Sequence, residues 1–431
     1  MVESDAAFPL RASDDQLRRA LLFAGELRTG CAVARGAFGH AVESILGHRA
    51  DAADHLEEAL AADPGLAAAH LVRGFAVRIL GRRDLFPGIR TSLAAARESF
   101  AERGAGEREQ VLHDALSDWL EGRAFAAADR LDVWLGQHPG DLLVIKLAHA
   151  LRFIFGDAPG MRRSVEAVLG GFGDEEPGAG YVHGCHAFTL EETGDRRRAE
   201  AVGRHGLALE PRDVWGLHAV AHVYYEEGRM RDGAAWLAGR DELLDGVNNF
   251  AGHLAWHEAL FHVELGRPGR ALDLYDRRID VYPPRDYRDV SNASTLLLLL
   301  QRAGLEVGDR WRRLAEIARE RKGDHGLSFA DLHYLLALLG AGARDEADGY
   351  LESMRRAAHE RDGFDALVAR EVGVPLGEAF VAAFAGRHAA AHAAVRALGA
   401  EVRRIGGSRA QRRVVPWALA ATEVGGRSAE A

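Results

Sequence analysis

The chain has 431 residues, 48 % hydrophobic and 27 % charged, a composition typical of folded globular proteins that excludes wholesale disorder. Its 64 acidic residues outnumber its 54 basic ones, and the formal charge of −10 argues against non-specific binding to nucleic acid or anionic membranes. The two cysteines, Cys31 and Cys185, are too few for a disulfide framework or a cysteine-based zinc ribbon.

The N-terminal segment carries no targeting pattern. Met1 to Gln16 lack a basic start followed by an apolar core, so we expect no signal peptide. The most apolar run, Thr295 to Leu300, is far shorter than the ~20 residues that span a bilayer. We therefore expect a cytoplasmic protein with no membrane and no nucleic-acid partner. The alanine and glycine richness, with lysine only at positions 146 and 322, indicates a GC-rich bacterial genome.

Helical segments of the chain end repeatedly at a glycine turn. Successive turns lie 34, 41, 34, 38, 34, 38 and 38 residues apart. A period of 34 residues is that of the tetratricopeptide repeat (TPR), a helix–turn–helix unit that stacks into a right-handed superhelix. The turn glycines are Gly47, Gly81, Gly122, Gly156, Gly194, Gly228, Gly266 and Gly304.

Prolines and small residues recur at fixed distances from these turns. Proline cannot continue a helix, and it stands 17 residues after three turns, at Pro64, Pro139 and Pro211. Small residues stand five positions after the turn, where paired helices cross, at Ala52, Ala127, Ala199, Gly233 and Ala271. These offsets agree with the 34-residue period.

The pattern predicts an all-α fold, a TPR-like solenoid of about ten antiparallel helix pairs in a right-handed superhelix that can close on itself. We expect residues 1–20 to form an N-terminal arm and residues 21–431 a single helical-repeat domain. The repeats should be regular over 21–304 and more divergent over 305–431. No alternation of period two, bounded by turn residues, predicts a strand.

Histidines gather on the face expected to line the concave groove of this solenoid. The first helix of each pair lines the groove with residues 13, 10, 6 and 3 positions before its turn glycine. One first helix carries His218 and His222, and the next carries His253 and His257. Each pair is spaced i, i+4, which puts two imidazoles on one helix face, as in a two-histidine metal half-site.

Two such half-sites on neighbouring helices can converge, and we predict His218, His222, His253 and His257 as ligands of a divalent transition metal. The competing interpretation is that each histidine is a hydrogen-bonded groove residue, because the HxxxH spacing is common in helices. In the stripe before Gly156 we find Lys146 and Phe153. The residues expected to bind a ligand are His113, His149, His218, His222, Tyr225, Glu226, His253, Trp256 and His257.

The segment GGSRAQRR, from Gly406 to Arg413, combines a glycine turn with arginines and has the look of a phosphate site. We favour a tight interhelical turn in which Ser408 caps the following helix. The sequence contains no G-x-S-x-G, no P-loop and no G-x-G-x-x-G after a strand. No standard catalytic motif therefore assigns the protein to an enzyme class.

Six segments carry a family resemblance: Glu107 to His113, His138 to His149, Asp213 to Gly233, Gly252 to Leu272, Val368 to Leu376 and Ile405 to Val415. Through them the chain resembles the tetratricopeptide repeat protein 38 family over nearly its whole length. The resemblance implies the solenoid, a cytosolic or extracellular-vesicle location and no settled activity. The family pattern it implies includes His149, the four histidines above, and the string Arg108, Glu109, Gln110 and His113. It does not include His183 and His186.

Two classes of function follow. Base rates favour a TPR-type interaction protein whose histidine-rich groove binds a peptide or protein partner. The alternative is a small-molecule enzyme or metal-binding protein with a histidine-lined central pocket for a small polar metabolite. The groove offers histidine and tyrosine rather than the lysine, arginine and asparagine clamps of peptide grooves. Either protein can form a homodimer, and the sequence leaves enzymatic activity open.

Overall fold

The computed structural model describes residues 19–20, 22–281 and 286–420. Helix accounts for 77 % of the structure, and no strand occurs in these ranges. The all-α fold expected from the sequence is confirmed. The N-terminal arm expected over residues 1–20 lies almost entirely outside the described residues, and Ala20 is already buried in the body.

The helices of the first half of the chain are α2 (Ala32–Leu46), α3 (Ala52–Ala62), α4 (Ala67–Ile79), η1 (Arg83–Leu85), α5 (Phe86–Arg103), α6 (Glu107–Leu120), α7 (Ala124–Gln137), α8 (Leu142–Ile154), α9 (Ala158–Val168), η2 (Leu169–Gly171), α10 (Ala179–Glu192) and α11 (Arg196–Leu209). Those of the second half are α12 (Val214–Glu226), α13 (Met230–Leu237), α14 (Asp241–Leu244), α15 (Phe250–Glu264), α16 (Pro268–Leu274), η3 (Tyr275–Ile279), α17 (Tyr287–Arg302), α18 (Arg310–Glu320), α19 (Ser328–Gly340), α20 (Arg344–Glu360), α21 (Phe364–Val368), η4 (Ala369–Gly373), α22 (Val374–Phe384), α23 (His388–Leu398), η5 (Gly399–Ile405), α24 (Arg409–Arg412) and α25 (Val414–Leu419).

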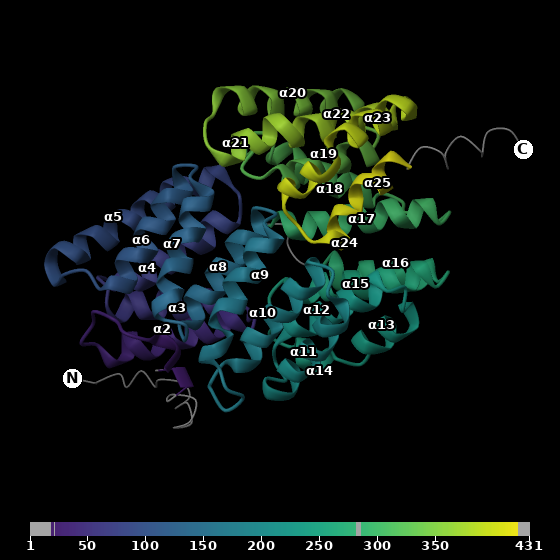
Figure 1. Cartoon of the computed structure of the whole chain (residues 1–431). Helices are drawn as coiled ribbons and strands as arrows, with labels where there is room; N and C mark the ends of the chain where they lie inside the picture. The colour runs from purple at the N-terminus through teal and green to yellow at the C-terminus, as the bar shows by residue number, and fades with distance from the viewer. Residues whose placement is uncertain (1–18, 21, 282–285, 421–431) are drawn as a thin grey trace, which may run out of the picture.

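Consecutive helices pack as hairpins. The pairs in the described ranges include α2 with α3, α4 with α5, α6 with α7, α8 with α9, α10 with α11, α12 with α13, α15 with α16, α17 with α18, α19 with α20 and α22 with α23. The first helices of successive hairpins also touch: α8 with α10, α10 with α12, α12 with α15, α15 with α17, and α17 with α19. Figure 1 shows the hairpins lying side by side along the chain.

The helices end where the sequence places the turn glycines. Seven of these eight glycines have positive φ, a backbone conformation that glycine adopts without strain. Gly47 is the exception, with a φ of −85°, and the next residue, His48, takes the left-handed conformation at 53°. A histidine therefore occupies the strained position of the first turn.

The C-terminal helices contact turns of the first half, and in Figure 1 the green and yellow helices lie above the teal ones and beside the blue ones. The carbonyl of Gly122 accepts a hydrogen bond from the amide of Phe364 at 2.9 Å. Gly156 lies so near the main chain of Arg403 that a Cβ at this glycine would be 2.0 Å from the Arg403 carbonyl oxygen. Only glycine allows this approach.

A second closing contact joins the turn after α2 to the segment before α15. The amide of Ala50 donates to the carbonyl of Gly246 at 2.9 Å, and the amide of Asn248 donates to the carbonyl of His48 at 2.8 Å. The first hairpin therefore touches the middle of the chain, and His48 is brought to the interior.

These contacts surround a central cavity of about 530 Å³ that is partly open to solvent. Its walls come from α2, α3, α4, α8, α12, α15, α17 and α19 and from the turn at Gly406 and Gly407. Two hydrophobic cores flank it and meet at α12, because Trp215 packs in the first core and Leu217 in the second.

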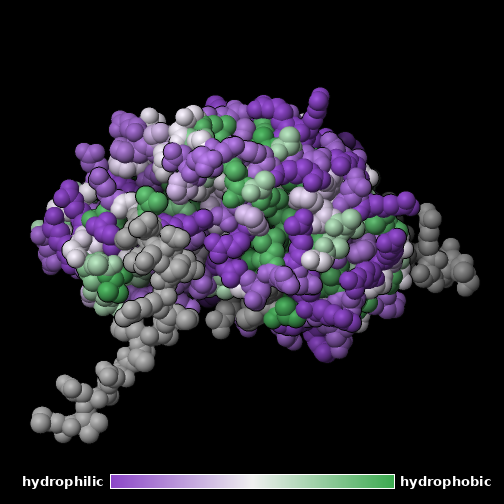
Figure 2. All heavy atoms as spheres, turned by 90° about the horizontal axis from the view of Figure 1, so that it is seen from below, coloured by the Kyte–Doolittle hydropathy of each residue, from purple (hydrophilic) through white to green (hydrophobic). Residues whose placement is uncertain are grey.

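Polar residues cover most of the face in Figure 2, and a band of hydrophobic residues runs near its middle. Among the described helices, none is long and apolar enough to cross a membrane.

The closing contact at Gly156 can be measured against a matched turn. Gly156→Ala and Gly228→Ala both place a Cβ at positive φ, and we expect each to cost about 1–2 kcal/mol of unfolding free energy. Nothing lies within 4 Å of a Cβ at Gly228, whereas one at Gly156 meets Arg403. Gly156→Ala should therefore cost an additional 1–3 kcal/mol, roughly, from overpacking. Urea unfolding measures both, and equal losses would contradict the closing contact.

Candidate functional site

Four histidines from two neighbouring helices meet in the interior. His218 and His222 lie one turn apart on α12, and His253 and His257 lie one turn apart on α15. All four are buried, and none is more than 8 % exposed. The two pairs face each other because α12 and α15 are first helices of consecutive hairpins and pack together.

Local hydrogen bonds start both helices at the required place. The carboxyl group of Asp213 caps α12 by accepting from the amides of Trp215 and Gly216 at 3.1 and 3.0 Å. Before α15, the side-chain oxygen of Asn248 accepts from the amide of Phe250 at 2.9 Å. These caps determine where the i, i+4 histidine pairs fall on the two helices.

The Nε2 atoms of the four histidines converge. Nε2 of His218 lies 2.8 Å from that of His222, 3.0 Å from that of His253 and 3.1 Å from that of His257. The four ligand nitrogens all lie within 4.8 Å of one another. In a tetrahedral site with metal–nitrogen bonds of 2.0–2.1 Å, the nitrogens lie about 3.3 Å apart. The three distances from His218 are slightly shorter than this value, and the other three nitrogen–nitrogen distances do not exceed 4.8 Å.

A partner on the outer nitrogen assigns the tautomer of His253. A neutral imidazole has one N–H and one lone pair. Nδ1 of His253 donates to Oδ1 of Asn292 at 2.9 Å, so its Nε2 directs a lone pair at Nε2 of His218. Nδ1 of His222 lies 3.4 Å from a carboxylate oxygen of Glu191, without a hydrogen bond between them.

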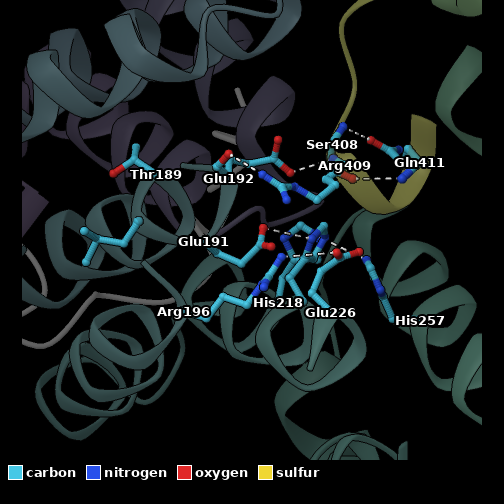
Figure 3. A network of polar contacts seen from close by, with 12 residues as sticks. Thr189, Glu191, Glu192, Arg196, His218, Glu226, His257, Ser408, Arg409 and Gln411 are labelled. Carbon is cyan, nitrogen blue, oxygen red and sulfur yellow. Dashed lines mark hydrogen bonds and ion pairs between the residues drawn. The ribbon is translucent and has the colours of Figure 1, made fainter. Parts of the chain in front are cut away.

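Two buried carboxylates lie behind the imidazoles, on α10. Glu191 is fully buried, and neither of its oxygens has a hydrogen-bond partner among the described residues. Glu192 accepts from the main-chain amide of Arg409 at 2.6 Å and pairs with Arg412 at 3.1 Å. Figure 3 shows Glu191 directed toward the imidazoles and Glu192 toward the turn at Arg409. With His222 they form a second group of three metal-ligating side chains.

Burial keeps the imidazoles of His218, His253 and His257 neutral. It lowers the pKa of His253 to about 3, and it lowers the pKa values of His218 and His257 well below the usual 6.5, with neighbouring histidines adding to the effect. Burial and the adjacent Glu191 raise the pKa of Glu192. Neutral imidazoles are the form that binds a metal ion.

The group of four borders the central cavity on one side only. His218 and His253 line the cavity, whereas His222 and His257 lie behind them. His149 also lines the cavity but does not belong to the group, because its Nε2 accepts a hydrogen bond from the indole N–H of Trp215 at 3.1 Å. A ligand in the cavity would therefore meet the metal-ligating group through two of its imidazoles.

Other residues expected to bind a ligand lie outside the cavity wall. His113, on α6, accepts from Arg97 at 3.0 Å and contacts Asp114. The Tyr225 hydroxyl donates to Glu264 at 3.4 Å, and Glu226 pairs with arginines of α11 and of the C-terminal turn.

Trp256 supports the group of four rather than the cavity. Its ring stacks on His253 with centroids 5.3 Å apart, and its indole N–H donates to Thr295 at 3.0 Å. This places Trp256 against the metal-ligating imidazoles without lining the cavity.

The GGSRAQRR segment forms a tight turn. Ser408 and Gln411 make a reciprocal capping box at the start of α24. Gly406, Gly407 and Gln411 line the cavity, while Arg409 and Arg412 bind Glu192. Arg409 and Arg412 therefore hold the turn against α10, and neither of them lines the cavity.

Sequence analysis missed Glu191, Asn292 and His48. Glu191 and Asn292 belong to helices on either side of the histidine pair, and the repeat offsets gave no reason to single them out. His48 is brought to the cavity by the closing contact between the ends of distant helices. One usable signal was the adjacent acid pair Glu191–Glu192 one turn before Gly194.

No protein-family model matches the chain. The resemblance to the tetratricopeptide repeat protein 38 family stays an expectation that depends on the six sequence segments. The site is therefore described from its own geometry.

The buried imidazole of His149 predicts a pH effect on stability. Burial lowers its pKa well below 6.5, so below that pH the unfolded chain binds a proton that the folded chain does not. His149→Gln keeps an acceptor for Trp215 and cannot be protonated. As the pH falls from 6.5 to 5, the wild type should lose about 1.4 kcal/mol of unfolding free energy per pH unit that the variant does not lose. Urea unfolding at several pH values measures this, and parallel curves would contradict a buried neutral His149.

Proposed function

We propose that the protein binds a divalent transition metal ion through His218, His222, His253 and His257, at the wall of a central cavity that holds a small molecule. The observation that carries this proposal is the convergence of four buried Nε2 atoms, with 2.8–3.1 Å between His218 and each of the others. Imidazole ligands suit zinc, copper, iron and nickel, and a four-nitrogen tetrahedral set fits Zn²⁺.

The charge balance around the imidazoles supports an ion. Four neutral imidazoles leave the two charges of a dication uncompensated, and a buried charge needs a counter-charge. Glu191 supplies one at 3.4 Å from His222. A carboxylate that receives the outer N–H of a metal-bound histidine orients the ring and raises its basicity. The same carboxylate without a nearby cation would be a fully buried charge with no hydrogen bond.

We also propose how the helical hairpins are arranged. We assign them to TPR-like repeats of a right-handed superhelix whose concave side is the cavity. Support comes from the glycine turns at the 34-residue period and from the contacts between successive first helices. In this arrangement α12 and α15 present equivalent faces inward, which is why their histidine pairs converge.

Pocket size favours a small molecule over an extended peptide. The pocket measures about 530 Å³ and is partly open to solvent, but the Gly406–Gly407 turn contributes to its wall, whereas a TPR peptide groove is open along its length. Pockets of this size hold small ligands. We therefore place the small-molecule alternative ahead of the interaction module that base rates favour.

Metal content of the purified protein tests the site. We expect about one equivalent of a transition metal by elemental analysis, and stabilisation by about 4 kcal/mol when free metal exceeds its Kd a thousandfold. His222→Ala combined with His257→Ala should remove the metal, and His218→Phe should do so while keeping an aromatic ring between Phe188 and Trp215.

The matched control is a second i, i+4 histidine pair, His388 and His392 on α23. The double alanine variant of this pair should keep the metal. Circular dichroism shows whether each variant is folded. A folded wild-type protein that takes up no Zn²⁺, Cu²⁺ or Ni²⁺ would overturn the proposal.

Glu191 provides a separate test. Glu191→Gln removes the charge behind His222 while keeping the size of the side chain, and we expect a 10- to 100-fold loss of metal affinity, roughly the effect of losing a carboxylate partner of a ligating histidine. The control is Glu166→Gln, because Glu166 lies 3.5 Å from Nε2 of His186, outside the group of four. Competition against a chelator of known affinity measures both. Unchanged affinity in Glu191→Gln would show that this carboxylate does not support the metal.

A further inference from the structure

Lys146 occupies an unusual position in the cavity. It is one of only two lysines in the chain, and every other basic residue is arginine. It lies on α8 among the cavity-lining residues, with its ammonium 5.0 Å from the ring centroid of Trp215. The indole of Trp215 in turn packs against His218, with centroids 5.1 Å apart. Lys146 and His218 therefore contact the same indole and line the same cavity.

The ammonium of Lys146 has N–H groups without an acceptor among the described residues. It carries three N–H bonds, and one donates to Nε2 of His48 at 3.1 Å. No carboxylate of the described residues forms an ion pair with it within 4.0 Å. Asp213, the buried carboxyl whose charge it influences, uses its oxygens to cap α12. Two N–H bonds and one positive charge thus remain at the cavity wall.

The other charged residues of the wall have partners. Arg288 pairs with Asp286, and Arg73 pairs with Glu57 at 3.4 Å. Arg49 donates to the main-chain carbonyl of Asp245 at an exposed contact. Among the described wall residues, Lys146 and Arg49 are therefore half-buried cations without a carboxylate within 4.0 Å, and Lys146 is the one next to the indole of Trp215.

His149 lies one turn from Lys146 on the same face of α8 and also lines the cavity. Because its Nε2 accepts from Trp215, the hydrogen of the neutral imidazole is on Nδ1. That Nδ1 is buried away from the cavity surface and has no hydrogen-bond partner among the described residues. Lys146 is therefore the donor of α8 that a ligand in the cavity can reach.

The rest of the wall is largely apolar. Its aliphatic and aromatic residues include Ile45, Leu56, Val77, Phe153, Phe250 and Phe329. Apolar walls with a few converging polar groups are typical of small-molecule sites. An ammonium with two free N–H bonds against an apolar wall fits a carboxylate better than a phosphate, which usually takes arginine forks or several amides.

We infer that the cavity takes a small organic acid, a monocarboxylate with an apolar body. Its carboxylate accepts hydrogen bonds from the ammonium of Lys146, and its body packs on the aliphatic and aromatic walls. The inference names the ligand class for the cavity of the proposed function. The carboxylate position depends on Lys146 and not on the metal.

Calorimetric titration of the metal-loaded full chain tests this with octanoate, octanol and inorganic phosphate. Octanoate should bind at least tenfold more tightly than octanol, about the factor for a charged hydrogen bond. Lys146→Met keeps the length of the side chain and removes the charge, so it should weaken octanoate binding 10- to 100-fold, roughly, and leave octanol unchanged. Lys322→Met, at the exposed second lysine, is the matched control and should bind octanoate as wild type does.

Equal binding of octanoate and octanol by wild type, or no effect of a folded Lys146→Met variant, would overturn the inference. Phosphate binding as tightly as octanoate would also overturn it, in favour of an inorganic anion site. Elemental analysis of the same samples separates the two proposals. Lys146→Met should retain the metal, and chelator-treated wild type should still prefer octanoate. If the wild-type protein takes up no metal at all and still prefers octanoate, the result would contradict the proposed metal function alone.

Discussion

The close approach of main chains at the glycine turns is the constraint on which the rest of the structure depends. A side chain at Gly156 would collide with the carbonyl of Arg403, and Gly122 receives the amide of Phe364 at 2.9 Å. Without these approaches the C-terminal helices could not lie against the first hairpins. An open row of hairpins would leave its inward face in water, so the imidazoles would lose the burial that keeps them neutral.

Enclosure changes the chemistry of the histidines. In water, an i, i+4 histidine pair on a helix is a weak half-site with a pKa near 6.5. Here burial lowers the pKa of His253 to about 3 and leaves Glu191 as a fully buried carboxylate at 3.4 Å from His222. Neutral ligands and a buried counter-charge are the two conditions for holding a dication away from water. The arrangement costs desolvation that a bound ion would offset.

Helix α12 couples the metal-ligating group to the cavity. Trp215, near its start, packs in the first hydrophobic core and contacts the ammonium of Lys146, whereas Leu217 packs in the second core. His218 follows within one turn and faces both the cavity and the other imidazoles. A shift of this helix would move the indole and the imidazoles together. The proposed acid and the proposed metal therefore depend on one rigid element.

The C-terminal turn acts on the same region from outside. Glu192 receives the main-chain amide of Arg409 and the guanidinium of Arg412, and it is next in sequence to Glu191. The capping box of Ser408 and Gln411 holds the turn in shape. The two adjacent glutamates thus link the C-terminal turn to His222 of the metal-ligating group. Their roles differ because their side chains point in different directions from α10.

By itself the sequence determined the all-α fold, the turn positions and the two histidine pairs, because these depend on local geometry: a glycine at positive φ and an i, i+4 spacing on one helix face. It also placed Lys146 on the inward face of its helix. The tertiary structure decided which of these residues meet. His113 lies elsewhere, and His149 turns to Trp215, while His48 and Glu191 reach the site from other hairpins. Such contacts join residues far apart in the chain, and their distances follow from how the helical hairpins pack on one another and not from any local period.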